Sequence, residues 1–99
     1  MRVQVKPYLF LREVLGNRYI SMNLPEGATV KELLQLVQKE TGLPENLTVK
    51  SASVTILGSN NETGLIILIN GCNIRQLQGL QYRLQEGDEI SLFPPAAGG

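Results

Sequence analysis

The residues of this sequence that are best suited to chemistry lie at its C-terminal end, which reads FPPAAGG over residues 93–99. The two prolines lack amide hydrogens and would form a stiff, projecting spacer. The small residues after them let the backbone pass a constriction that a larger side chain would block. The group delivered is the α-carboxylate of Gly99, which is ionised at neutral pH. Extended at roughly 3.3 Å per residue, residues 94–99 would reach about 20 Å, far enough to enter another protein's active site.

A carboxylate becomes a good electrophile only when one of its oxygens is made a leaving group, commonly by transfer to the α-phosphate of ATP. The sequence has no GxxxxGKS/T loop to bind that ATP, so activation would have to come from a partner. Small, apolar chain ends also occur without any function. Taken alone, the residues of the tail leave the functional and the inert interpretations open.

The rest of the composition excludes most other enzyme chemistry. The chain has no histidine and a single cysteine, which removes Ser-His-Asp and Cys-His machinery and the usual zinc ligand sets. Cys72 has no histidine to activate it and no resolving partner, so a structural role is expected. Asp88 and Glu89 are neighbours at a predicted strand and would point to opposite faces, which disfavours a shared metal ion. A turn explains Asp88 better, and no bound cofactor is expected.

Charge and hydropathy indicate the environment of the protein. Nine basic and nine acidic residues give a net charge of zero, without the basic stripe of a nucleic-acid binder. The N-terminus has no apolar signal segment, and the apolar run at residues 65–69 is too short to cross a bilayer. With the lone cysteine, these features predict a cytoplasmic domain that binds neither nucleic acid nor membrane.

The clearest predicted element is a helix over residues 29–41. Thr29 and Glu32 have the spacing of a capping box, and Gly42 stands where a left-handed C-cap belongs. Apolar residues recur on one face with helical spacing, at Val30, Leu33, Leu34 and Val37.

Alternating or β-branched apolar residues predict strands in the N-terminal segment and at residues 20–24, 54–57, 65–69 and 89–93. Residues 65–69 read LIILI, which predicts a central strand covered on both faces. Leu9 and Phe10 are expected side by side on the first strand, one facing the core and the other in a docking patch or under a connector. FLREVLG, residues 10–16, predicts a short helical turn, and Asn70-Gly71 a tight hairpin turn.

The order of these elements predicts an α+β fold, a sheet with one main helix packed across one face. Residues 1–93 would form one domain, and residues 94–99 a flexible C-terminal tail. The composition, with 42% hydrophobic and 18% charged residues, is typical of such a globular domain.

Four segments resemble the MoaD/ThiS family of ubiquitin-like β-grasp sulfur carriers: YLFLREVLG, TVKELLQLVQKETG, ILINGCNI and EGDEISLFPPAAGG. The resemblance covers nearly the whole chain and is most specific in the tail. FPP before a Gly-Gly end is more similar to the MoaD branch and to small archaeal modifier proteins than to the thiamine-pathway branch. The polar segment at residues 58–64 looks like an insertion. The resemblance implies a mixed β-grasp sheet with one main helix.

The resemblance also implies a carrier rather than an enzyme. An E1-like enzyme would use ATP to adenylate the carboxylate of Gly99, and sulfur transfer would then give a thiocarboxylate. The chain would act as the small subunit of molybdopterin synthase, inserting its tail into a larger MoaE-like subunit. The candidate residues are Gly98 and Gly99 at the reacting end, and Phe93, Pro94, Pro95, Ala96, Ala97 and Arg12 in contact with partners.

Two other functions remain open at this point. The activated terminus of a small archaeal modifier protein can instead form an isopeptide bond with a lysine of a target protein, and one chain could serve both roles. A plain interaction domain with an inert tail is the third possibility. The chain's own lysines, Lys6, Lys31, Lys39 and Lys50, could be acceptors in such conjugation or simply solvated charges.

Overall fold

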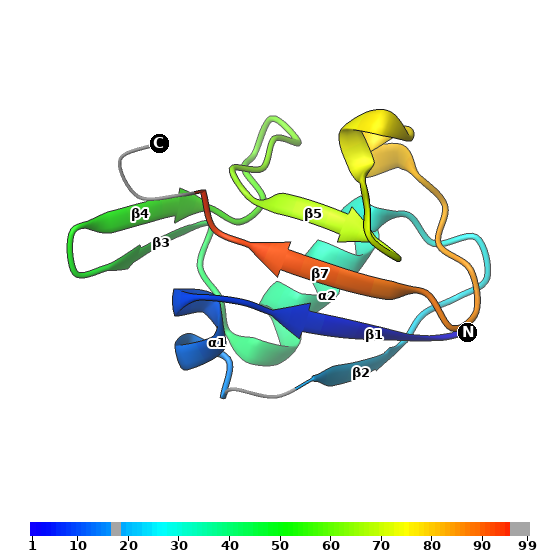
Figure 1. Ribbon diagram of the computed structural model, residues 1–99, viewed down its shortest axis with the longest axis horizontal. Coiled ribbons are helices and arrows are strands. Elements are labelled where there is room, and N and C mark those ends of the chain that lie inside the picture. Colours follow the sequence, from blue (N-terminus) through cyan, green and yellow to red (C-terminus); the bar gives the residue numbers. More distant parts are fainter. Residues whose placement is uncertain (17–18, 96–99) are drawn as a thin grey trace.

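The computed structural model describes residues 1–16 and 19–95. It forms one mixed β-sheet with a long helix, α2, crossing one of its faces (Figure 1). In chain order the described elements are β1 (Arg2–Pro7), α1 (Phe10–Val14), β2 (Ile20–Asn23), α2 (Val30–Thr41), β3 (Asn46–Val49), β4 (Ala52–Thr55), β5 (Ile66–Ile69), β6 (Cys72–Asn73), the 3-10 turns η1 (Ile74–Gln76) and η2 (Gly79–Gln81), and β7 (Glu89–Phe93).

The main sheet has the strand order β2-β1-β7-β5-β6. The first and last strands, β1 and β7, are parallel neighbours, whereas the other pairs are antiparallel. This arrangement confirms the predicted α+β fold with a mixed sheet. Its consequence for function is that the last strand lies in the middle of the sheet, so the C-terminal tail starts from the best-supported part of the fold.

Helix α2 follows directly from its local sequence. The Thr29 amide donates to Glu32 Oε1 at 2.9 Å, and the Glu32 amide donates to Thr29 Oγ1 at 3.3 Å, so both halves of the capping box are formed. Gly42 ends the helix with a φ of 77°, a conformation that costs glycine little. The predicted apolar face is buried at Val30, Leu33, Leu34 and Val37.

The prediction that Leu9 and Phe10 are neighbours on a strand was wrong. Strand β1 ends at Pro7, Leu9 is the N-cap of α1, and Phe10 is the first residue of that helix. The chain leaves the strand direction here because the Leu11 and Arg12 amides donate to the carbonyls of Tyr8 and Leu9, at 3.1 and 3.0 Å. The helical turn expected for FLREVLG is confirmed.

The LIILI segment is also covered differently from the prediction. Strand β5 pairs with β7 along its whole length and with β6 at only two positions. Ile67 and Ile69 are buried, whereas Ile66 is 42% exposed and Leu68 is half-buried. Only alternate residues are fully covered, because α2 packs on one face of the sheet (Figure 1).

Strand β3 was not predicted, and the strand predicted at residues 54–57 ends earlier. Strands β3 and β4 pair with each other, Leu47 opposite Val54, as a separate two-stranded sheet. Ile56 and Leu57 follow β4 and are buried without belonging to it. The predicted Asn70-Gly71 turn is confirmed: it joins β5 to β6 with positive φ at both residues, 51° and 86°.

Candidate functional site at the root of the C-terminal tail

Strand β7 fixes the point from which the tail starts. It is paired on one side with β1, where Pro7 lies opposite Leu92, and on the other with β5, where Ile66 lies opposite Phe93. The Tyr8 amide extends the β1 side by donating to the Leu92 carbonyl at 3.0 Å. Because both edges of β7 are hydrogen-bonded, the backbone at the root of the tail is held rigidly.

Three apolar side chains surround this root. The rings of Tyr8 and Phe93 are stacked, with 4.3 Å between their centroids and 8° between their planes. Phe93 and Ile66 are cross-strand partners. Their sequence neighbours Leu92 and Ile67 are buried on the face that α2 covers. Because successive side chains of a strand point to opposite faces, Phe93 and Ile66 point to the face opposite α2. We call Tyr8, Ile66 and Phe93 the root patch. It is partly exposed apolar surface, a feature that marks interaction sites when it is contiguous.

The sequence predicted that Pro94 and Pro95 both belong to a projecting spacer, and the structure differs from this prediction at Pro94. Pro94 is buried and Pro95 is exposed. A proline cannot donate a hydrogen bond to a strand ladder, so Pro94 ends β7 and packs on the body of the protein. The predicted residues Ala96, Ala97, Gly98 and Gly99 lie outside the described residues, and their roles stay predictions.

Helix α1 places Leu9 and Arg12 in one turn beside Tyr8. Leu9 is 62% exposed, with φ 56° and ψ −136°, a conformation that is unfavourable for a residue with a β-carbon. The side chain of Arg12 is exposed and the Arg12 amide donates to the Leu9 carbonyl at 3.0 Å. The predicted contact residue Arg12 therefore lies on the element that follows Tyr8 of the root patch.

A charged cluster that the sequence did not reveal occupies the same sheet face. Lys6 Nζ lies 2.9 Å from Glu89 Oε2 and 4.5 Å from the centroid of the Tyr19 ring. The hydrogen bond to the Glu89 carboxylate, together with that to Tyr19, raises the pKa of Lys6 above its usual range. Lys6 and Glu89 lie on the adjacent parallel strands β1 and β7. The alternation of residues in each segment could have placed both side chains on the exposed face, but nothing in the sequence showed that the two strands pair.

Asp88 has the turn-forming role predicted for it. The carboxylate is buried and accepts hydrogen bonds from the Gln85 amide at 2.8 Å and from Asn70 Nδ2 at 2.9 Å. Asn70 Oδ1 in turn accepts from the Glu89 amide at 2.9 Å. These bonds tie the β5–β6 turn to the turn that starts β7.

No side-chain cluster suited to a metal ion occurs within residues 1–16 and 19–95. Cys72 is partly buried, with Sγ 3.8 Å from both the Asn73 carbonyl and Gln76 Oε1. None of the described helices is long and apolar enough to span a membrane.

The architecture defines a class of protein: a ubiquitin-like β-grasp domain, in which the last strand, β7, occupies the middle of a mixed sheet. A family model described as the ThiS family matches residues 10–99. This chain belongs to the ThiS family, as the tail and the capped helix indicated.

Similar proteins carry two kinds of name. Small archaeal modifier protein 3 of Haloferax volcanii is 30% identical over 100 residues, covering all of both chains. A putative sulfur carrier protein of Archaeoglobus fulgidus is 32% identical over 75 residues, 75% of this chain and 77% of that protein. The crystal structure of SAMP1 from Haloferax volcanii superposes with a TM-score of 0.75 at 26% identity, over all of both chains. The relatives are thus carriers or modifiers.

Proposed function

We propose that this chain is a carrier whose Gly99 carboxylate is adenylated by an E1-like enzyme and then converted to a thiocarboxylate. The observation that carries the proposal is the fixed root of the tail, formed by a central strand that is paired on both edges as far as Phe93. A rigid root followed by a short tail limits how far the terminal carboxylate can lie from a docking surface. Membership of the ThiS family supports this use of the terminus.

The chemistry divides between the chain and its partner. The Gly99 carboxylate attacks the α-phosphate of ATP bound by the partner, releasing pyrophosphate and leaving an acyl adenylate. Hydrosulfide then attacks the acyl carbon, AMP leaves, and the product is a terminal thiocarboxylate. ATP is used by the activating enzyme, so the carrier itself needs neither a nucleotide site nor a catalytic side chain.

The root patch supplies the docking surface. Tyr8, Ile66 and Phe93 form partly exposed apolar surface directly below the tail, and interfaces are commonly centred on such aromatic anchors. Leu9 and Arg12 extend this surface onto α1. An exposed leucine held in an unfavourable backbone conformation adds no core packing, which is consistent with a role in contacting a partner.

For the acceptor we propose the pterin precursor of molybdopterin synthase, bound by a larger MoaE-like subunit that receives the tail. A second candidate is an isopeptide bond between Gly99 and lysines of target proteins. It is favoured by the full-length relative named small archaeal modifier protein 3. Both reactions start from the same adenylate and require the same terminal glycines.

Intact-mass analysis tests the proposal directly. The N-terminally tagged chain is recovered from its native cells under denaturing conditions and compared with a chain lacking Gly99 and with Gly98→Ala. A free chain in which sulfur replaces one oxygen supports the carrier function. Tagged species heavier by whole proteins, absent without Gly99, support conjugation. Finding only unmodified chain in actively growing cells would contradict both.

A further inference from the structure

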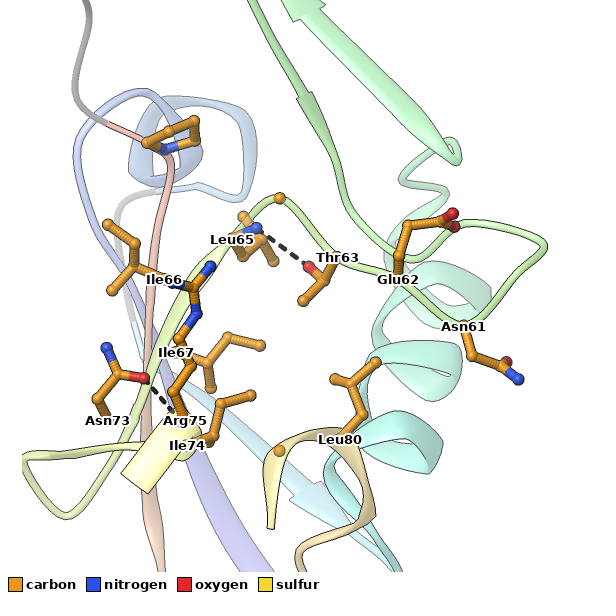
Figure 2. A pocket seen from close by; sticks show the side chains of 13 residues that line it. Asn61, Glu62, Thr63, Leu65, Ile66, Ile67, Asn73, Ile74, Arg75 and Leu80 are labelled. Carbon is orange, nitrogen blue, oxygen red and sulfur yellow. Dashed lines mark hydrogen bonds between the residues drawn. The ribbon is translucent and has the colours of Figure 1, made fainter. Parts of the chain in front are cut away.

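A pocket of about 690 Å³ opens beside β5, between residues 61–65 and the two 3-10 turns (Figure 2). Its size lies in the range of binding pockets. Its apolar lining residues are Leu65, Ile66, Ile67, Ile74, Leu80 and Pro95. Ile66 also belongs to the root patch, where it pairs with Phe93, so the pocket adjoins the surface on which the activating enzyme is proposed to dock.

The pocket carries an unpaired cation. Arg75 is exposed, and no hydrogen bond or ion pair joins its guanidinium to another described residue. Glu62 also lines the pocket but does not neutralise this charge. Its carboxylate fills the space that a β-carbon on Gly58 would need, and Figure 2 shows it turned away from Arg75. The pocket therefore offers a positive charge beside apolar walls.

Local hydrogen bonds hold both walls of the pocket. On one wall, the Leu77 amide donates to the Ile74 carbonyl at 2.9 Å and closes η1, whose first residue is buried. On the other wall, the Leu65 amide donates to Thr63 Oγ1 at 3.1 Å. Because these bonds form within the free chain, the pocket is preformed, and a partner that fills it does not have to order the walls.

We propose that this pocket receives an extended segment of the activating enzyme in which an acidic side chain neighbours an apolar one. The carboxylate binds the Arg75 guanidinium, which can form two hydrogen bonds with it, and the apolar side chain lies against Ile66 and Leu80. A cavity at the border of a docking surface accepts side chains that project from the docked protein, and an unpaired cation selects an acidic one. The choice of the activating enzyme as partner rests on the proposed function.

Kinetics with the activating enzyme test the contribution of Arg75. The enzyme is purified from the same cells by ATP–pyrophosphate exchange that depends on the full chain. Three variants are compared: Arg75→Gln, Arg75→Glu, and Arg2→Gln, whose arginine is exposed and lies outside the pocket. We expect KM to rise about 1.4- to 5-fold in Arg75→Gln, the range for loss of an exposed ion pair, and further in Arg75→Glu. With kcat unchanged, this rise reports binding. Arg2→Gln should leave KM unchanged.

Photo-crosslinking identifies what fills the pocket. The photoreactive residue p-benzoylphenylalanine replaces Leu80, which lines the pocket, or Gln35, an exposed residue of α2 that serves as the control. Each chain is irradiated together with the purified enzyme, and the crosslinked peptides are sequenced. We expect position 80, and not position 35, to crosslink to an enzyme peptide in which an aspartate or glutamate stands beside an apolar residue.

Two results would overturn the proposal while leaving the proposed function intact. One is an unchanged KM in both Arg75 variants with the full chain still adenylated. The other is that position 80 gives no crosslink to the enzyme, or crosslinks only to a second copy of the chain. If no fraction of the cells shows pyrophosphate exchange that depends on the chain, the proposed function fails and this inference fails with it, so the two kinds of failure are distinguishable.

Discussion

Tyr8, just after the first strand, and Phe93, at the end of the last, stack face to face with their ring centroids 4.3 Å apart. The parallel pairing of β1 and β7 brings these two residues together. The stack therefore places a side chain of the N-terminal segment against the last residue of β7, where the C-terminal tail begins.

Phe93→Ala should separate docking from folding. Loss of the stacked pair and of part of the root patch should lower the free energy of unfolding by about 1–3 kcal/mol while the chain remains folded. The apparent KM of the activating enzyme for the chain should rise, because the docking surface is lost. Tyr8→Phe is the matched control, since it keeps both rings. An unchanged KM in Phe93→Ala, with the fold intact, would remove the root patch from the docking surface.

Leu9→Gly should stabilise the fold relative to Leu9→Ala and still impair activation. Leu9 has a φ of 56° and a ψ of −136°, a conformation that glycine adopts at lower cost. We expect Leu9→Gly to be more stable than Leu9→Ala by about 1 kcal/mol in denaturant unfolding. Both variants lose the exposed side chain and should show a similar rise in KM. If the alanine variant were the more stable, the backbone strain at this position would be refuted.

Asp88→Ala should be strongly destabilising for a surface turn. The buried carboxylate accepts from the Gln85 amide and from Asn70 Nδ2, and its removal leaves both donors without that acceptor. We expect a loss of about 1–3 kcal/mol in the free energy of unfolding. Glu86→Ala, an exposed residue of the same turn, should change it by about 0.5 kcal/mol or less. Equal effects of the two substitutions would show that the Asp88 contacts add nothing.

Lys6 should be a poor acceptor for acylation. The Glu89 carboxylate and Tyr19 raise its pKa. Every lysine is mostly protonated at neutral pH, and the raised pKa makes the neutral, nucleophilic fraction of Lys6 smaller than that of an ordinary lysine. The stabilising contribution of the pair should be complete below the unfolded pKa and be lost as the pH rises through the higher folded value. In a brief acetylation followed by peptide mapping, Lys39 and Lys50, which are exposed, should react faster than Lys6.

Glu89→Gln provides the sharper readout for Lys6. It removes the carboxylate charge while keeping a side chain of similar shape, so acetylation of Lys6 should become severalfold faster with Lys39 unchanged. A Lys6 rate that does not respond would mean that burial, rather than the charge of Glu89, limits its reaction.

The elements that could be predicted from the sequence are those whose stabilising contacts are local. The capping box of Thr29 and Glu32, the left-handed Gly42 and the Asn70-Gly71 turn each depend on hydrogen bonds or φ values within a few residues, and each was predicted. The family was recognisable for a similar reason, because the segments that carry the resemblance are each continuous in the sequence.

Which distant segments meet became clear only from the packing of the whole fold. The stack of Tyr8 on Phe93 and the pairing of Lys6 with Glu89 follow from β1 and β7 being neighbours, and no local pattern fixes that pairing. The same holds for Ile66, whose exposure depends on which face α2 covers, and for Arg75 of η1, which lines one pocket together with Ile66 and Pro95. Contacts between residues far apart in the chain are set by the free energy of the whole packed sheet, which a periodicity read over a few residues does not contain.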